Sequence, residues 1–298
     1  MNNAEIAFGQ AERNVCSLFK AGTEFCFDGC RYVTMFSDKP TIAYGEPKTD
    51  IFIRARASDT KQIKDIKISY KKSNADFLEN KITALRAAEI FGPQWAQILI
   101  TATTSIANKF LDRPRIYLED YRQTEAGSIT LGWKFEFVRR AAGDLSGEII
   151  LDNMQRIDIY SGRMLPAEKR NARVNGEVIA NSGVADYILN ADCVGSAQDA
   201  IDHLVRIDDF APKQRIFFAC KALNYRTLHI PPKCDGNRPL AVQVEWFVNK
   251  AGKLDSRLDF SNPLTKKGYA MRDKLKDAMV KIGACSTKEL NSNNCSLL

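Results

Sequence analysis

The sequence predicts an α/β protein in which helices flank a mixed central β-sheet, followed by a region richer in β-strands. Two observations predict this fold class. Up to about residue 125, segments with the helical spacing of apolar residues alternate with segments that have the polar and apolar alternation of strands. Beyond that point, paired strand-like segments dominate. We therefore expect a first domain over residues 1–125 and a second over residues 126–298, or one integrated domain with the same two parts.

The elements of the first part are predicted from apolar spacing and from the residues that end helices. Gly22 follows the first helix, and Pro114 prevents much extension of the third. The second helix stops at Gly92 and Pro93. The expected elements are a helix at residues 3–20, strands at 25–35 and 41–44, a β-hairpin at 50–72, and helices at 75–91 and 94–111.

Residues 126–298 are predicted to form two pairs of strands and a helix near the end of the chain. Glycine-containing turns at residues 143–147 and 250–253 join the strands of each pair. The expected elements are strands at 128–140 and 148–151, strands at 240–248 and 254–260, and a helix at 265–282.

Composition indicates a soluble, cytoplasmic protein. Hydrophobic residues make up 45% of the chain, which is enough for a packed core. No window approaches the roughly 18 to 20 consecutive apolar residues of a membrane-spanning helix, and the first residues lack the basic and apolar regions of a signal peptide. The eight cysteines and two histidines do not have the spacing of a zinc site, so we expect reduced thiols.

The positive charge is concentrated in the last third of the chain. The formal net charge is +7, yet residues 211–298 hold 16 Lys and Arg against 7 Asp and Glu, so they carry +9 and the preceding residues sum to −2. A local positive field suits a polyanion such as nucleic acid, and it equally suits a surface whose charge only aids solubility. The sequence contains no GxxxxGK[ST] phosphate loop, no GxGxxG motif and no GxSxG elbow, which removes the strongest signals for nucleotide binding and for a serine hydrolase.

The hairpin at residues 50–72 is expected to bring three polar side chains together. Alternate side chains of a strand share a face, so Ser69 and Lys71 lie on the same side. A turn centred on residues 59 and 60 makes the numbers of paired residues sum to about 119, which places Asp50 opposite Ser69. The other acidic residue of the second strand, Asp65, would pair near Arg54, about 13 Å nearer the turn. The central group is therefore Asp50, Ser69 and Lys71.

The segments Pro47-Lys48-Thr49-Asp50 and Ser69-Tyr70-Lys71 resemble the PD-(D/E)xK nuclease superfamily. In that superfamily, an aspartate at the start of one strand faces an acidic-x-lysine triplet near the end of the next. Serine stands here where the second acid is expected, as in some type II restriction endonucleases that take the missing carboxylate from the following helix. The resemblance covers about residues 1–112 and is specific over residues 46–81. It implies a restriction-endonuclease-like core that hydrolyses DNA phosphodiesters with Mg²⁺.

The resemblance also implies a role for each residue. Asp50 and a second carboxylate would hold Mg²⁺ through hard oxygen ligands, and Lys71 would contact the attacking water and the phosphate. Ser69 can only form hydrogen bonds. The preferred second acid is Glu79, in the first turns of the helix expected at 75–91. The alternatives are Asp76, Glu89 and Glu46, and Glu12 on the first helix could add an outer ligand or orient water.

Two segments, residues 165–189 and 213–229, could contact DNA. Their basic and amide side chains can bind phosphates or base edges, although either segment could be a polar surface loop. A double-stranded DNA target would favour a homodimer with two symmetric active sites. The competing functions are a non-catalytic nucleic-acid-binding protein with the same fold, an assembly protein, and an enzyme that cuts RNA. The candidate DNA-binding residues are Lys169, Arg170, Arg173, Asn175, Asn181, Arg215, Lys221 and Arg226.

Overall fold

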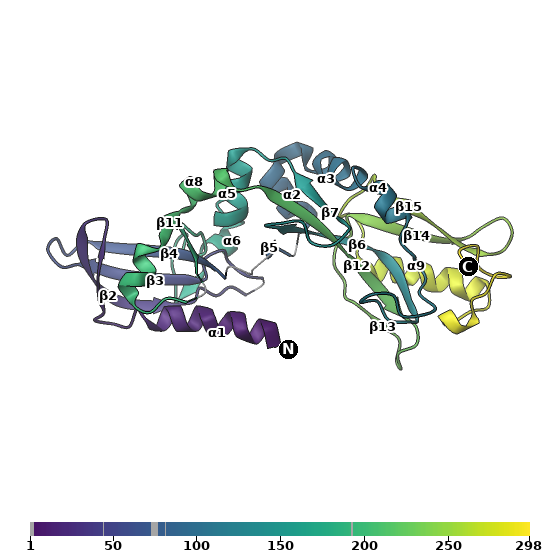
Figure 1. Cartoon of the computed structure of the whole chain (residues 1–298), viewed down its shortest axis with the longest axis horizontal. Helices are drawn as coiled ribbons and strands as arrows, with labels where there is room; N and C mark the ends of the chain where they lie inside the picture. The colour runs from purple at the N-terminus through teal and green to yellow at the C-terminus, as the bar shows by residue number, and fades with distance from the viewer. Residues whose placement is uncertain (1–2, 44, 73–76, 81, 192) are drawn as a thin grey trace. The chain divides into compact units, whose positions relative to one another are not determined.

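The chain forms two compact units in the computed structural model, which describes residues 3–43, 45–72, 77–80, 82–191 and 193–298 (Figure 1). Unit 1 comprises Met1–Asp76 and Leu151–Gln214, and unit 2 comprises Phe77–Ile150 and Arg215–Leu298. Each unit combines β-sheet with helices, so the predicted α/β class is confirmed. The boundary expected near residue 125 falls inside unit 2, because each unit is built from two separate stretches of the chain.

Unit 1 contains a six-stranded mixed sheet with the strand order β1-β2-β3-β4-β10-β11. Every neighbouring pair is antiparallel except β4 and β10, which are parallel. A parallel pair cannot be joined by a tight turn, and the chain between β4 and β10 includes the first stretch of unit 2. The mixed sheet expected in the first part of the chain is thus present, but residues beyond 125 complete it. The strands are β1 Glu24–Phe27, β2 Cys30–Asp38, β3 Ile51–Ala57, β4 Ile63–Lys71, β10 Tyr187–Asn190 and β11 Leu204–Arg206.

Two helices of unit 1, α1 and α7, pack on one face of this sheet. Val15 of α1, Phe19 just after it and Ile201 of α7 belong to the same buried cluster as Ile53 and Ile66 of the central strands. Figure 1 shows α1, in purple, running beside the strands of its unit. The remaining elements of unit 1 are α5, α6 and α8, a 3-10 helix and a short hairpin. The bounds are α1 Asn3–Ser17, α5 Asn153–Ser161, α6 Ala167–Arg170, β8 Arg173–Val174, β9 Glu177–Val178, α7 Ala197–Asp202, α8 Ile207–Phe210 and η2 Ala211–Lys213.

The β3–β4 hairpin has the predicted register. Ile51 pairs with Ile68 and Arg54 pairs with Asp65, so the paired residue numbers sum to 119. Lys61 closes the turn with a φ of 60°. Ile51 and Ile68 are fully buried in the core together with Ile53 and Ile66 on the same face of the hairpin. The opposite face carries charged and polar side chains beside the buried Phe52.

Unit 2 is built on a seven-stranded antiparallel sheet. Its main path is β13-β12-β6-β14-β15, with β5 beside β6 and β7 beside β12. The four strands predicted in this part of the chain are present, but β7 pairs with β12 rather than with β6. Strand β12 lies in a segment considered above as a surface loop. The strands are β5 Phe77–Glu79, β6 Ser128–Val138, β7 Ser146–Ile149, β12 Ile216–Arg226, β13 Lys233–Cys234, β14 Val242–Val248 and β15 Leu254–Asp259.

The helices of unit 2 differ from prediction at residues 75–111. The predicted start of the helix at 75–91 is wrong, because residues 77–79 form β5. Helix α2 begins after Thr83, whose side chain accepts a hydrogen bond from Arg86 N and caps the helix. The helix expected at 94–111 is interrupted after Thr104, where hydroxyl groups bond to backbone oxygens, including Thr104 Oγ1 to Ile100 O at 2.7 Å. None of the helices within the described ranges is long and apolar enough to cross a membrane. The helices are α2 Ala84–Phe91, η1 Gly92–Gln94, α3 Trp95–Thr104, α4 Ala107–Leu111, α9 Gly268–Lys281 and η3 Thr287–Glu289.

Candidate active site

The predicted group of Asp50, Ser69 and Lys71 forms in unit 1. Asp50 precedes β3, and its backbone continues the hairpin ladder by donating from N to Ile68 O at 2.8 Å. Its side-chain Oδ2 accepts a hydrogen bond from Tyr70 N at 2.8 Å. The same oxygen lies 3.4 Å from Ser69 Oγ and 3.4 Å from Lys71 Nζ. Three donors from the end of β4 therefore orient the Asp50 carboxylate.

Burial strengthens this arrangement. Ser69 is 1% exposed, and the side chains of Asp50 and Lys71 are 17% and 22% exposed. Charges so far from bulk water are screened less than charges on the surface. Among the described residues, no group donates a hydrogen bond to the second carboxylate oxygen of Asp50, Oδ1. One oxygen of this carboxylate is thus fixed, and the other can accept a ligand.

Helix α1 brings a second carboxylate, Glu12, into the electrostatic neighbourhood of Asp50. Burial raises the pKa of Glu12, and the negative charge of Asp50 raises it further, whereas the charges of Lys39 and Lys71 oppose this effect. The Glu12 side chain is 16% exposed and forms an ion pair with Lys39. Sequence reasoning gave Glu12 only an accessory role. Its placement depends on the packing of α1 against the sheet.

Lys39 was not identified from the sequence. It follows β2, and the pairing of Asp38 with Phe52 brings this end of β2 to the beginning of β3. Burial lowers the pKa of Lys39, but its hydrogen bond to Glu12 and the charges of Glu12, Asp50 and Glu46 more than offset this, so the pKa is raised. No local motif marks Lys39, because only the pairing of β2 with β3 gives it this position. The result is a cluster of two acids and two lysines from α1, β2, β3 and β4.

Glu79, the preferred second acid, has a different environment from the one expected. It ends strand β5 in unit 2, not a helix that follows β4. Arg86 Nε lies 2.9 Å from Glu79 Oε1, and Arg86 is 4% exposed. Arg86 also lies 3.5 Å from Glu89. The prediction that Glu79 lies in a helix following β4 is therefore wrong. Asp76, one of the alternatives, lies outside the described residues.

The acidic residues near Asp50 are compatible with a magnesium ion. Within the described ranges, no group of three or more His, Cys, Asp or Glu side chains gathers as a metal site. Mg²⁺, however, is usually bound by one or two carboxylates together with waters and substrate phosphates. Glu12 and Asp50 supply two such carboxylates, and their mutual repulsion is of the kind that a bound cation relieves. The donor chemistry of this pair thus fits Mg²⁺.

The first set of candidate DNA-binding residues lies around the loop that leads to Asp50. Gly183 O accepts hydrogen bonds from Lys48 N at 2.9 Å and from Thr49 N at 3.2 Å. The end of the Lys169 side chain lies beside Gly45. The hairpin β8–β9 joins the same region, because Thr41 and Arg173 form a β-bridge. Arg170 is half-buried, Asn175 N donates to Asp38, and Asn181 O accepts from Lys67.

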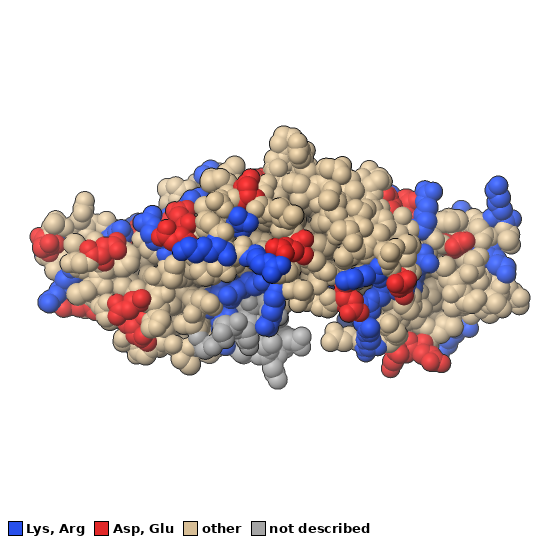
Figure 2. Space-filling model, turned by 45° about the horizontal axis from the view of Figure 1, so that its top comes forward, with Lys and Arg blue, Asp and Glu red and all other residues tan. Residues whose placement is uncertain are grey.

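The second set of candidate DNA-binding residues lies on β12 or just before it in unit 2. Each of its cations forms an ion pair with an acidic residue. Arg215 is paired with Glu148, and Lys221 Nζ lies 3.1 Å from buried Glu136. Arg226 contacts Asp235 at 2.8 Å and also Glu125. Figure 2 shows Lys and Arg side chains standing beside Asp and Glu on the visible face. These three cations have structural ion pairs, which reduces the charge that they can offer to DNA.

Comparison of the chain with protein-family models, with curated proteins and with solved structures gave no match.

Proposed function

We propose that unit 1 carries a Mg²⁺-dependent centre that hydrolyses DNA phosphodiester bonds. The observation that carries this proposal is the meeting of Glu12, Asp50 and Lys71 in one largely buried cluster. Glu12 takes the role for which Glu79 was first considered. The second carboxylate then comes from the helix before the hairpin, and Ser69 serves only to orient Asp50.

Each member of the cluster has a distinct task in this proposal. Mg²⁺, when bound, would polarise the scissile phosphate and lower the pKa of a bound water. Asp50 Oδ1 and the Glu12 carboxylate would hold the ion. Lys71 would place its ammonium group beside the phosphate and stabilise the negative charge that develops there. Lys39 favours the ionised form of Glu12, because its positive charge opposes the effects of burial and of Asp50.

The substrate in this proposal is DNA. Lys169 and Arg173 lie beside the loop before Asp50, where their charges can contact the phosphate backbone. On a duplex target, two copies of the chain related by a two-fold axis would place one centre on each strand.

A non-catalytic nucleic-acid-binding protein is the second candidate. Ser69 favours it, because a hydroxyl group is a weaker ligand for Mg²⁺ than the carboxylate that the superfamily has at this position. The ion pair between Lys71 and Asp50 also neutralises the main acid without a metal.

Cleavage of plasmid DNA in the presence of Mg²⁺ tests the proposed function. We expect Asp50→Asn and Lys71→Ala each to lower the cleavage rate at least about 100-fold. The matched controls are Asp65→Asn, on the same face of the hairpin but paired with Arg54, and Lys61→Ala in the turn; both should cleave at nearly the wild-type rate. Binding of DNA without cleavage by the wild type would favour the second candidate, and cleavage unaffected by Asp50→Asn would exclude this centre.

A further inference from the structure

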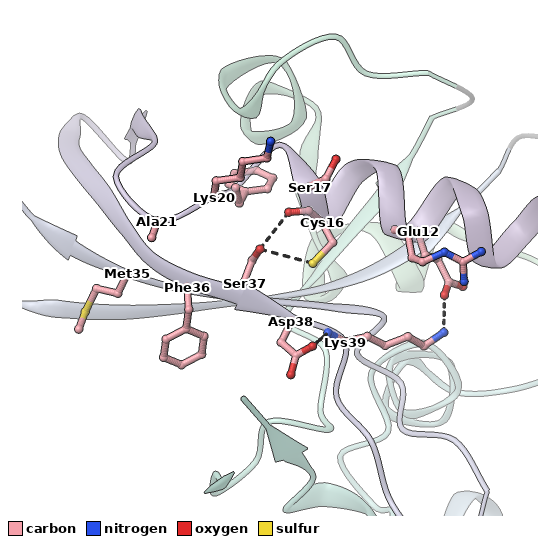
Figure 3. Close-up of a pocket in the computed structure, with 12 residues that line it drawn as sticks. Glu12, Cys16, Ser17, Lys20, Ala21, Met35, Phe36, Ser37, Asp38 and Lys39 are labelled. Atoms are coloured by element: carbon pink, nitrogen blue, oxygen red, sulfur yellow. Dashed lines mark hydrogen bonds and ion pairs between the residues drawn. The ribbon is translucent and has the colours of Figure 1, made fainter. Parts of the chain in front are cut away.

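A groove of about 500 Å³ leads away from the candidate active site in unit 1. Figure 3 shows it between helix α1 and the later part of strand β2, with Glu12 and Lys39 at one end, Ala21 and Met35 at the other, and Lys20 between them. Cavities of this size hold small ligands or single monomers of a polymer. Since Glu12 and Lys39 belong to the cluster around Asp50, whatever occupies the groove would lie next to the reacting phosphate.

The groove follows a part of β2 that β1 does not cover. The pairing of β1 with β2 ends at Val33, and Thr34 then bonds to Gly22 and Thr23. From there to Asp38, β2 pairs with β3 and with no other strand among the described residues. Neighbouring side chains of this segment point to opposite sides of the strand, as Figure 3 shows for Phe36 and Ser37. The groove therefore exposes the backbone polar groups along this edge of β2. It also exposes side chains from both faces of the strand.

The charges of the groove favour an anionic ligand. Three cations, Arg13, Lys20 and Lys39, line it together with two acids, Glu12 and Asp38. Both acids are already engaged: Glu12 pairs with Lys39, and Asp38 accepts hydrogen bonds from the backbone N of Lys39 and Asn175 at 2.8 and 2.7 Å. Across the described part of the chain, neither Arg13 nor Lys20 forms an ion pair. These two cations are left to bind negative charge from a ligand.

An aromatic ring adds a second kind of contact. Phe36 lines the groove from the face of β2 that points away from α1 (Figure 3), is partly exposed, and stacks on Phe52 with ring centroids 6.1 Å apart. Arg54 lies 5.6 Å from the centre of the Phe36 ring and fixes it from the other strand. Met35 also lines the groove. Aromatic rings beside cations bind unpaired bases by stacking while the cations bind the backbone, and the bases of an intact duplex cannot stack in this way because they stack on one another.

We propose that this groove binds an unpaired nucleotide of the DNA strand beside the phosphate that is cut. The proposal rests on the proposed function and narrows the substrate from duplex DNA to DNA with a single-stranded segment. Arg13 and Lys20 contact the backbone of that segment, and Phe36 stacks on a base. An acidic peptide would satisfy the cations, but it would not use the ring.

Binding of labelled oligonucleotides, measured by fluorescence anisotropy without divalent metal, tests the groove independently of cleavage. A single strand should bind the full-length protein at least about 10-fold more tightly than the duplex of the same sequence. The double variant Arg13→Glu, Lys20→Glu should weaken single-strand binding about 10-fold or more and should flatten its dependence on salt. Phe36→Leu, which keeps an apolar side chain without a ring, should weaken single-strand binding and leave duplex binding unchanged.

Arg31→Glu is the control for a charge reversal elsewhere in unit 1, because Arg31 of β2 is exposed and lies outside the groove. It should bind as the wild type does. Equal binding of single strand and duplex, or wild-type binding by the double variant, would overturn the proposal. Competition by a short polyglutamate peptide as strong as that by unlabelled oligonucleotide would also overturn it, in favour of a peptide ligand.

The two proposals fail in distinguishable ways. If single strands bind through the groove but no DNA is cut with Mg²⁺, the proposed function is wrong and the groove proposal stands as a binding site. If cleavage requires Asp50 but the groove variants bind and cut as the wild type does, the groove proposal alone is wrong.

Discussion

Glu12 and Asp50 are two carboxylates held near each other away from bulk water, which costs free energy unless positive charge lies close by. Lys39 and Lys71 supply that charge in the structure. A divalent cation bound between them would supply more positive charge than a single lysine. The electrostatics of these residues therefore link metal binding to the ionisation of Glu12.

Mg²⁺ should stabilise the folded protein in a pH-dependent way. A ligand that binds only the folded state raises the Tm, and protons compete with the metal for Glu12. Because burial and Asp50 raise the pKa of Glu12 above its usual value of 4.5, the Mg²⁺-dependent rise in Tm should weaken on acidification at a higher pH than for an ordinary glutamate. Thermal unfolding with and without Mg²⁺ across a pH series measures this.

In the metal-free protein, the stability that depends on Glu12 should change with pH in the opposite direction. A carboxyl group with a raised pKa in the folded state contributes stability that is fully present below its ordinary pKa and is lost as the pH rises through the raised pKa.

Asp50→Asn should abolish the stabilisation by Mg²⁺, whereas Asp65→Asn should retain it. Equal stabilisation of both variants would place the metal elsewhere.

Among the individual elements, the start of helix α2 explains why Glu79 does not lie in the helix predicted for it. The apolar spacing of residues 75–91 is compatible with one continuous helix, but Thr83 caps a shorter one that starts at Ala84. Phe77 and Glu79 instead pair with residues of β6. The N-cap preference of threonine and its low helix propensity were the local signals available for this break.

Thr83→Ala distinguishes the two descriptions by the sign of its effect. If Thr83 is the N-cap of α2, its loss should lower the free energy of unfolding by about 1 kcal/mol. If Thr83 lay within a helix that began at residue 75, alanine would be the better helix former and the variant would be slightly more stable. Urea denaturation of the wild type and the variant measures the difference.

The parts of the site that could be predicted are those whose residues lie close together in the sequence or are joined by a single turn. The positions of Asp50 and Ser69 follow from strand alternation and one turn, so the hairpin register was accessible from the sequence. Glu12 and Lys39 join them only through the packing of α1 and the pairing of β2 with β3. No local rule specifies such contacts, because they depend on how the whole sheet is assembled.

At the scale of the whole molecule, the two units are interleaved along the chain. The parallel pairing of β4 with β10 joins residues 68–71 to residues 187–190, and Tyr187 and Leu189 are part of the unit 1 core. Such a distant parallel contact leaves no pattern in the intervening sequence. The predicted division near residue 125 could not reveal it.

A fragment of residues 1–125 should therefore fail to fold. It would lack β10, β11 and α7, so the apolar surface of β4 and β1 would lose its partners. Circular dichroism should show no cooperative thermal unfolding for this fragment, in contrast to the full chain. A sharp transition in the fragment would mean that the first 125 residues form a domain on their own.

The identity of the second carboxylate is tested by comparing Glu12→Gln with Glu79→Gln in Mg²⁺-dependent DNA cleavage, below the Tm of both variants. We predict that Glu12→Gln lowers the cleavage rate at least about 100-fold, because it removes the second carboxylate beside Asp50. Glu79→Gln should remain active, because the Glu79 side chain is paired with Arg86 in unit 2. Full activity of Glu12→Gln would exclude Glu12 as a ligand of the metal, and loss of activity in a folded Glu79→Gln would assign the second carboxylate to Glu79.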